Sequence, residues 1–484
     1  MEFEPVIGLE VHAQLLTESK IFCACSTKFG APPNSHTCPV CLGLPGALPV
    51  LNRQAVGMAV KTGLALGCQI NQSSIFARKN YFYPDLPKGY QISQYDLPIA
   101  ENGAVALLIA DESSPDEVTH VQREFGITRL HLEDDAGKSI HISGGDTRVN
   151  LNRTGVPLME IVTEADFRSA AEAYEFLQYL RKVLLYLGVC DGNMEEGSLR
   201  CDANVSVRPL GTTPFGTKTE IKNLNSFRFL RKALEYEISR QEELLREGGA
   251  VVQETRLWDE ESEQTVVMRS KEEAHDYRYF PEPDLLPIVV SQEWLDRLES
   301  EIPELPEARR KRFLEEHRLD PEAALHLTQS RAMADYFEEV VAGFQNPAAI
   351  ANWIMGDLTR DLKRDGLEIQ DSPVSPLHLA QLARLVEEGK ISGKLAKDVF
   401  AKTYASGKSP ETIVKEEGLR QISDQGELEA VVDRVISEHP NEVETFRSGK
   451  HGLIGFFVGQ VMKKTRGQAN TKLVNDLLQT KLLS

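Results

Sequence analysis

The hydrophobic pattern changes near residue 290, and this change limits the possible fold more than any other feature of the sequence. Before it, short β-rich runs such as VIGLEVHAQL, GITRLHLEDD and CDANVSVRPL alternate with turns. Two long helices are predicted there, one ending at Gly188 and one beginning after Ser226. After it, amphipathic helices follow one another, punctuated by Pro and Gly. Strands and helices do not alternate, so we expect an α+β fold: an N-terminal mixed or antiparallel β-sheet domain followed by all-α helical domains.

A chain of 484 residues is too long for one ordinary core, and its pattern predicts three domains. Residues 1–292 form the sheet domain, which includes a cysteine-rich loop at 23–41. Residues 293–406 form a helical domain that ends near YASGKSPE, a segment containing Gly, Ser and Pro. Residues 407–484 form a small helical tail domain.

The charge of the tail differs from that of the whole chain. The chain carries a formal net charge of −19, which disfavours a general nucleic-acid binder. From residue 447 onward, however, seven Lys or Arg accompany a single acid. Such a tail either binds RNA phosphates or presents a solvated helix face, and the pattern alone leaves both readings open.

The start of the chain and its hydropathy bear on its location. The first ten residues, MEFEPVIGLE, lack the basic and apolar regions of a signal peptide. No uninterrupted apolar run approaches the roughly 18 residues that a membrane span needs. We therefore expect a cytoplasmic protein that does not work with a membrane.

Four of the seven cysteines lie close together in FCACSTKFGAPPNSHTCPVCLGLPG. Cys23 and Cys25 form one tight pair, and Cys38 and Cys41 form another. Two such pairs are what a four-thiolate zinc site needs, and a site with four protein ligands is structural because it has no open position. Two alternatives stay open: reduced thiols without a metal, and His36 in place of one cysteine.

Acidic residues and a histidine suggest a second site. If VIGLEVHAQL is a strand, Glu10 and His12 point to the same face, about 7 Å apart along the strand. Asp134 stands at the end of another predicted strand, and Glu160 interrupts an apolar run, where an unpaired carboxylate is costly to bury. Mg²⁺ prefers oxygen ligands, so Glu10, Asp134 and Glu160, with His12 beside them, could form a Mg²⁺ site if the fold brings them together. Solvated acids at strand ends are the alternative.

The common nucleotide and hydrolase motifs are absent from the sequence. There is no G-x-x-x-x-G-K-[ST], no G-x-G-x-x-G and no G-x-S-x-G. Any ATP chemistry must therefore use a different binding loop.

Several long segments in the right order closely resemble the B-subunit family of the bacterial amidotransferases that act on Glu-tRNA(Gln) and Asp-tRNA(Asn). The resemblance covers the whole chain. It implies a glutamine synthetase-like catalytic fold in the first domain and a glutamine-hydrolysing carbon–nitrogen ligase activity, in which ATP phosphorylates the side-chain carboxylate and ammonia then displaces phosphate. It also implies a heterotrimer with an A subunit, which supplies ammonia from glutamine, and a C subunit. The segments are VIGLEVHAQL, RKNYFYPDLPKGYQISQYD, GITRLHLEDDAGKS, LNRTGVPLMEIV, EEGSLRCDANVSVRP, KNLNSFRFLRKALEYEISRQ, DYRYFPEPDL and GQVMKKTRGQAN.

The resemblance also implies roles for particular residues. Glu10 and His12 match the catalytic site, and together with Asp134 and Glu160 they match its Mg²⁺ ligands. The chain departs from the family pattern at Asp134, where many members have glutamate, and at Asn150, where many have an acid. The four cysteines match the zinc-binding members of the family. In the tail, which resembles a tRNA-contacting domain, the implied tRNA-binding residues are Lys463, Lys464 and Arg466.

Three alternative functions follow from the same residues. The related archaeal-type E subunit carries an extra domain, for which 484 residues leave no room. A zinc-stabilised tRNA-binding module would have structural acids and no chemistry. A metal-dependent hydrolase is disfavoured because the sequence lacks a His-rich ligand set.

Overall fold

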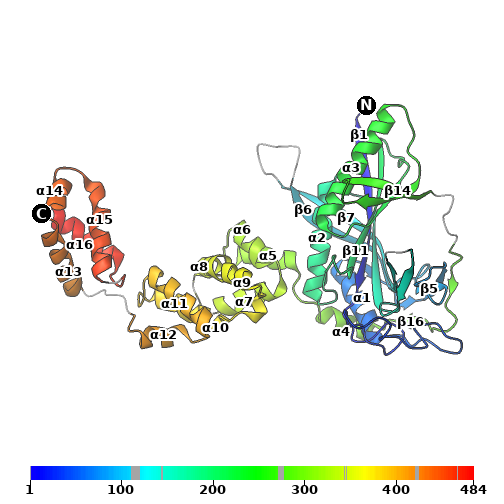
Figure 1. Ribbon diagram of the computed structural model, residues 1–484, viewed down its shortest axis with the longest axis horizontal. Helices are drawn as coiled ribbons and strands as arrows, with labels where there is room; N and C mark the ends of the chain where they lie inside the picture. The colour runs from blue at the N-terminus through cyan, green and yellow to red at the C-terminus, as the bar shows by residue number, and fades with distance from the viewer. Residues whose placement is uncertain are drawn as a thin grey trace. The chain divides into compact units, whose positions relative to one another are not determined.

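The computed structural model describes residues 2–110, 120–142, 145–270, 277–342, 344, 346–419, 425–465 and 467–483. The chain forms two compact units, Met1–Leu305 and Pro306–Ser484. Within the described ranges, none of the helices is both long enough and apolar enough to span a bilayer. The predicted order of a sheet domain followed by helices is confirmed (Figure 1).

A nine-stranded sheet forms the centre of the first unit. Its strand order is β14-β13-β12-β11-β1-β10-β7-β6-β2, and its neighbours run antiparallel except for the parallel pair β12 and β13. The first strand in the sequence therefore lies in the middle of the sheet. The strands are β1 (Phe3–Gln14), β2 (Gln69–Ile70), β6 (Ala100–Ala110), β7 (His120–Asp134), β10 (Pro157–Thr163), β11 (Leu199–Pro209), β12 (Thr219–Lys222), β13 (Glu254–Asp259) and β14 (Gln264–Ser270).

Helices cover one face of this sheet. They are α1 (Arg53–Ala65), α2 (Ala170–Leu187) and α3 (Phe227–Arg246), and α4 (Gln292–Ser300) packs against α1. Both long helices that the sequence predicts are present. Ser226 caps α3 by accepting a hydrogen bond from Phe229 N at 3.1 Å, and Gly188 ends α2 at a φ of 65°, a left-handed conformation that favours glycine.

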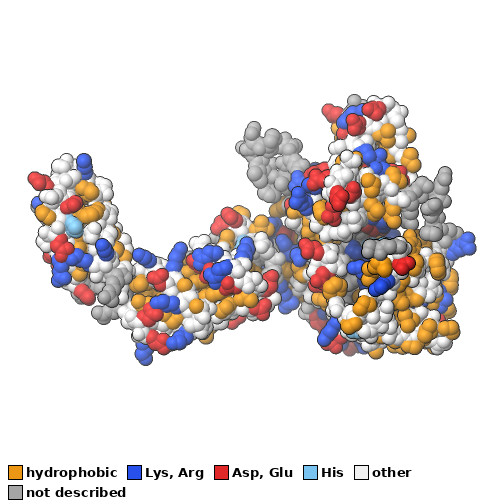
Figure 2. Space-filling view, viewed as in Figure 1, with side chains coloured by type: hydrophobic (Ala, Val, Ile, Leu, Met, Phe, Trp, Pro, Cys, Tyr) orange, Lys and Arg blue, Asp and Glu red, His pale blue; other side chains and the backbone are white. Residues whose placement is uncertain are grey.

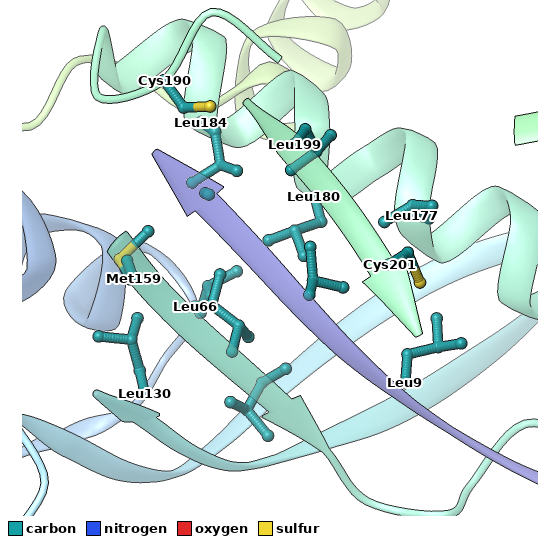
Figure 3. Close-up of a cluster of buried hydrophobic side chains, with 14 of the residues drawn as sticks. Leu9, Leu66, Leu130, Met159, Leu177, Leu180, Leu184, Cys190, Leu199 and Cys201 are labelled. Atoms are coloured by element: carbon teal, nitrogen blue, oxygen red, sulfur yellow. The ribbon is translucent and has the colours of Figure 1, made fainter. Parts of the chain in front are cut away.

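The apolar face of the sheet explains this packing. Alternate residues of β1 are buried, as the sequence predicts, because side chains along a strand point to opposite faces. Leu9 of β1 and Met159 of β10 point toward the leucines of α2, which repeat at helical spacing (Figure 3). The other face of the sheet is thereby left to polar side chains.

Three smaller sheets complete the first unit. The three-stranded sheet is important for the site, because its strand β5 contacts β7. These sheets contain β15-β4-β5, β16-β3 and β8-β9, with the bounds β3 (Ser73–Ser74), β4 (Ala77–Asn80), β5 (Tyr90–Ser93), β8 (Lys138–His141), β9 (Thr147–Asn150), β15 (Phe280–Pro281) and β16 (Ile288–Val289).

The second unit is helical and contains two apolar cores. One core is built from residues between Phe313 and Ile413, and the other from residues between Leu428 and Leu482. Acidic and basic side chains are mixed over the surface that Figure 2 shows of this unit. The predicted boundaries at 292/293 and 406/407 stay predictions. The helices are α5 (Pro306–Glu315), α6 (Pro321–Leu327), α7 (Arg331–Val341), α8 (Pro347–Trp353), η2 (Ile354–Leu358), α9 (Thr359–Asp365), η3 (Ile369–Asp371), α10 (Pro376–Glu387), α11 (Gly393–Ser406), α12 (Pro410–Glu416), α13 (Gln425–Glu438), α14 (Pro440–Arg447), η4 (His451–Leu453), α15 (Ile454–Lys464) and α16 (Thr471–Leu483).

Candidate functional site

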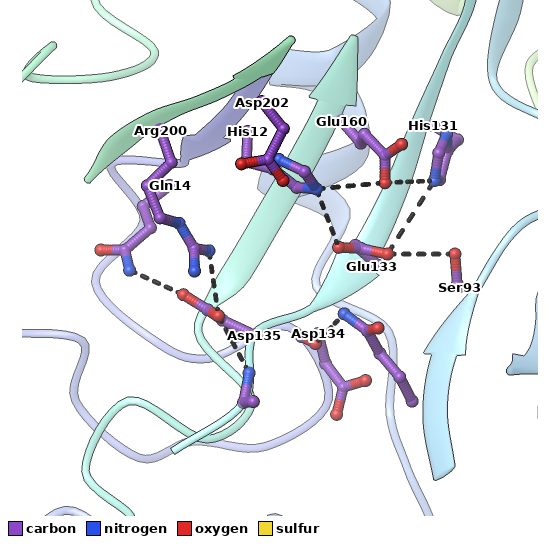
Figure 4. Close-up of polar contacts among 12 residues, drawn as sticks. His12, Gln14, Ser93, His131, Glu133, Asp134, Asp135, Glu160, Arg200 and Asp202 are labelled. Atoms are coloured by element: carbon purple, nitrogen blue, oxygen red, sulfur yellow. Dashed lines mark hydrogen bonds and ion pairs between the residues drawn. The ribbon is translucent and has the colours of Figure 1, made fainter. Parts of the chain in front are cut away.

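A row of polar residues crosses four neighbouring strands on the face of the sheet opposite α2. His12 of β1 pairs in register with Arg200 of β11 on one side and with Glu160 of β10 on the other. Glu160 in turn pairs with His131 of β7. Directly opposed residues on neighbouring strands point to the same face, so the pairing brings residues from four distant parts of the sequence together (Figure 4).

Glu133 joins this row from two residues further along β7. His12 Nε2 lies 3.3 Å from Glu160 Oε2 and 4.0 Å from Glu133 Oε1, and His131 Nε2 lies 3.3 Å from Glu160 Oε2. The ligand atoms of His12, Glu133 and Glu160 all lie within 4.8 Å of one another. Two carboxylates, with water and phosphate oxygens completing the shell, are a usual Mg²⁺ donor set, so these three residues fit a divalent cation.

The charges in this group shift one another's pKa values. Burial would lower the pKa of His12, but the neighbouring carboxylates of Glu160 and Glu133 outweigh it and raise the pKa to about 8. The two histidines overcome the effect of burial on Glu160 and hold its pKa well below the ordinary value. Without a cation, the group at neutral pH therefore contains anionic Glu160 beside a positively charged His12, and His12 would release this proton on binding a metal ion.

Glu10 lies on the same face as His12, as the sequence predicts, but outside the three-residue ligand group. Asn204 donates a hydrogen bond to Glu10 Oε1 at 2.9 Å. Burial, followed by the charge of Glu160, raises the pKa of Glu10. Asp202 is its register partner on β11, and Lys222 Nζ pairs with Asp202 at 2.7 Å.

Asp134 is not brought to this group. Its neighbour Glu133 points to the polar face of β7, so Asp134 points to the opposite face. There it pairs with Lys88, and its Oδ1 accepts a hydrogen bond from Ile92 N at 2.7 Å. The carboxylate thus links β5 to the end of β7, and Glu133, rather than Asp134, lies beside His12 and Glu160.

Lys79 of β4 is a further charged residue near the carboxylates of the site. Its Nζ lies 5.0 Å from the centre of the Tyr277 ring and 5.9 Å from that of Tyr81. Burial would lower the pKa of Lys79, but the charges of Glu133 and Glu160 raise it. The alternation of side chains along β7 or β10 cannot predict this lysine, because it lies on a strand of the separate three-stranded sheet.

The four cysteines of the loop form a compact group of thiols. Their sulfur atoms lie within 4.8 Å of one another, and Cys38 Sγ and Cys41 Sγ are 3.9 Å apart. A tetrahedron with Zn–S bonds of about 2.3 Å has S–S edges of about 3.8 Å, so the group fits zinc. Hydrogen bonds from Cys23, and the backbone N–H of Cys38, lower the pKa of Cys41 to about 4. His36 uses its backbone carbonyl to accept a hydrogen bond from Lys20 Nζ at 2.7 Å.

Asn150, the last residue of β9, is hydrogen-bonded to the cysteine loop. Asn150 Oδ1 accepts hydrogen bonds from the backbone N–H groups of Asn34 and Asn152, at 3.3 and 3.1 Å. Asn150, where many family members have an acid, therefore stabilises a turn through its side-chain amide oxygen.

The basic tail residues lie in the second unit. Lys463 and Lys464 lie in the last turn of α15, and Lys464 Nζ lies 2.7 Å from Glu438 Oε1. Arg466 lies outside the described residues.

Comparison with known proteins gives full-length matches. Residues 5–296 match the family described as GatB/GatE catalytic domain, and residues 335–482 match the GatB domain. The B subunits of the aspartyl/glutamyl-tRNA(Asn/Gln) amidotransferases from Carboxydothermus hydrogenoformans and Thermodesulfovibrio yellowstonii are each 56% identical to this chain, with 99% of both chains covered. The protein of that name from Trichlorobacter lovleyi is 55% identical over the full length of both chains. The chain therefore belongs to the B-subunit family of these amidotransferases, as its sequence segments predict.

Proposed function

We propose that this chain is the carboxylate-activating subunit of a glutamine-hydrolysing, tRNA-dependent amidotransferase. Its substrates are glutamate attached to tRNA(Gln), aspartate attached to tRNA(Asn), or both. Family membership supports the reaction class. The observation that carries the assignment to this chain is the group of His12, Glu133 and Glu160 on one face of the central sheet, whose ligand atoms lie within 4.8 Å of one another.

The proposed reaction has two steps. A side-chain carboxylate oxygen of the aminoacyl group attacks the terminal phosphorus of ATP, and the bond from that phosphorus to the bridging oxygen breaks to release ADP. Ammonia then attacks the acyl carbon of the resulting acyl phosphate. The carbon–oxygen bond to phosphate breaks, phosphate leaves with a proton from the nitrogen, and the amide remains.

Each step brings negatively charged oxygens close together, and the polar face supplies groups that offset this charge. His12, Glu133 and Glu160 would hold Mg²⁺, which neutralises and orients phosphate oxygens when bound. Glu133 takes the place of Asp134 in this ligand set because it shares a face with His12. Glu10 lies two residues before His12 on β1 and is the second proposed catalytic residue, and the Lys79 ammonium adds positive charge beside the carboxylates.

The remaining proposals concern partners, the second metal and location. Ammonia is a small nucleophile that competes with water, so we propose an A subunit that releases it from glutamine and a C subunit that completes the heterotrimer. Zinc in the group of four cysteines would be structural. Lys463, Lys464 and Arg466 would contact tRNA phosphates, and the protein would work in the cytoplasm.

The experiment measures ADP release by the chain assembled with its A and C subunits and Mg²⁺, with Glu-tRNA(Gln) or with uncharged tRNA. Glu10→Gln is the test variant. Glu4→Gln is its matched control, because Glu4 lies on the same strand but pairs with Arg208 at 2.9 Å. We expect release that needs the charged tRNA, falls about 100-fold or more in Glu10→Gln and survives in Glu4→Gln. No ADP release with the charged tRNA would favour a tRNA-binding module without chemistry. Release that survives in Glu10→Gln would overturn the catalytic role of Glu10.

A further inference from the structure

Arg200 is a cation on the polar face with no role in the mechanism so far. It is the direct register partner of His12 on the neighbouring strand β11. Its charge opposes the rise in the pKa of His12, which indicates that the guanidinium lies close to the ligand group. About 35% of its side chain is exposed, so a bound molecule can reach it.

Asp135 holds this guanidinium in place. Arg200 Nη2 lies 3.1 Å from Asp135 Oδ1, and the Asp135 side chain is only 3% exposed. Gln14 Nε2 donates to the other carboxylate oxygen at 2.8 Å, and Arg153 Nε lies 3.6 Å from it. The carboxylate is therefore fixed from three sides, and the positive charges of Arg200 and Arg153 outweigh burial and lower its pKa (Figure 4).

The pairing leaves part of the Arg200 donor set unused. A guanidinium carries five N–H donors in a planar fork, and Asp135 engages the Nη2 side. Arg200 Nε is buried and has no hydrogen-bond partner among the described residues. A buried, unpaired donor is costly in a folded protein, unless a ligand completes it.

Arg153 and Arg200 both pair with Asp135, but the N–H donors of Arg153 bind backbone carbonyls. Arg153 donates from Nε to the carbonyl oxygen of Ala136 at 2.9 Å and from Nη2 to that of Gly137. Its donors are thus directed to the turn after β7. Of the two arginines on Asp135, Arg200 is the one that contributes to the electrostatic surroundings of His12.

We propose that Arg200 binds the terminal phosphoryl group of ATP, and that Asp135 is the residue that positions it. This inference rests on the proposed function. An arginine fork matches the oxygens of a phosphoryl group and forms short, charge-assisted hydrogen bonds with them. Its position beside His12 puts this positive charge next to the proposed Mg²⁺ ligands, where charge on the transferred group must be offset.

The test compares nucleotide affinities of the complete complex, measured as equilibrium binding of a non-hydrolysable ATP analogue, ADP and AMP. The variant is Arg200→Met. Its matched control is Arg153→Met, which removes the same charge from the same Asp135. We expect the affinity for the ATP analogue to fall about tenfold or more in Arg200→Met, with ADP and AMP changing less than about twofold. In Arg153→Met all three affinities stay within about twofold of wild type.

Conservative replacement separates phosphate contact from a structural role. Arg200→Lys keeps the charge but not the fork, so it should recover part of the ATP-analogue affinity that Arg200→Met loses. Circular dichroism checks that each variant is folded.

Three results would overturn the proposal for Arg200: unchanged affinity for the ATP analogue in Arg200→Met, an equal loss for all three nucleotides, or an equal loss in Arg153→Met. A wild-type complex without affinity for the ATP analogue would overturn the proposed function as well. A wild-type complex that releases ADP while Arg200→Met binds normally would overturn only the role of Arg200.

Discussion

Neighbouring acids at the end of β7 should respond to mutation in opposite ways. Glu133 and Asp134 are adjacent in the sequence but face opposite sides of the sheet. Glu133→Gln removes a ligand of the proposed Mg²⁺ site, and we expect kcat for charged-tRNA-dependent ADP release to fall about 100- to 1000-fold. The loss in stability should be smaller than in Asp134→Asn, because Gln keeps the size of the side chain and the ring nitrogens of His131 and His12 lie as far as 3.9 and 4.0 Å from the carboxylate.

Asp134→Asn should instead lower stability and leave catalysis largely intact. Lys88 and Asp134 form a buried pair, with side chains 7% and 1% exposed. Removing one partner of such a pair costs about 3–5 kcal/mol because the other charge stays buried, and Asn can still accept the hydrogen bond from Ile92 N. The expected loss of unfolding free energy therefore lies at the lower end of that range.

Urea unfolding followed by tryptophan fluorescence gives the stability of both variants, and initial rates of ADP release by the full complex give their activity. The reasoning fails if Asp134→Asn is as inactive as Glu133→Gln at wild-type stability. It fails equally if Glu133→Gln keeps full activity. Either result would mean that the faces of β7 do not decide which acid serves the site.

Three further predictions concern other parts of the chain. Hydrogen bonds from Arg240 and other partners lower the pKa of Glu237, although burial would raise it. The Glu237 carboxylate therefore stabilises the fold above its ordinary pKa of 4.5, and this stabilisation is lost as the pH falls below 4.5. Glu237→Gln should make the unfolding free energy depend less on pH in this acid range. Cys41→Ser should reduce bound zinc, measured by atomic absorption, from one ion per chain to almost none. Lys463→Ala should weaken tRNA binding and lower the slope of log affinity against log salt by about one, measured by titration at several salt concentrations.

Much of the fold is local and was open to prediction. The caps at Ser226 and Gly188 and the change to continuous helices all come from short segments. The alternation of β1 likewise puts Glu10 and His12 on one face without knowledge of any partner strand. The same alternation along β7 puts Glu133 on the face of the site and Asp134 on the opposite face. The place of Glu133 could therefore be predicted from the sequence.

The remainder depends on pairing between distant strands. Arg200 and Glu160 meet His12 only because β11 and β10 flank β1, and nothing in the short-range pattern specifies that order. Lys79 reaches the carboxylates from a separate small sheet. Long-range register and sheet docking are tertiary properties, so no single segment could reveal these neighbours.

The central place of β1 has a consequence for synthesis of the chain. This strand is translated before both of its partners, which are β10, ending at Thr163, and β11, ending at Pro209. At about 5–20 residues per second, some 10–40 s pass between the emergence of β1 and that of its second partner. During this time both backbone edges of β1 stay unpaired, and after β10 has emerged one edge stays unpaired, so that another chain can bind there. The backbone edge of β1 that pairs with β11 therefore stays open until residue 209 has emerged from the ribosome.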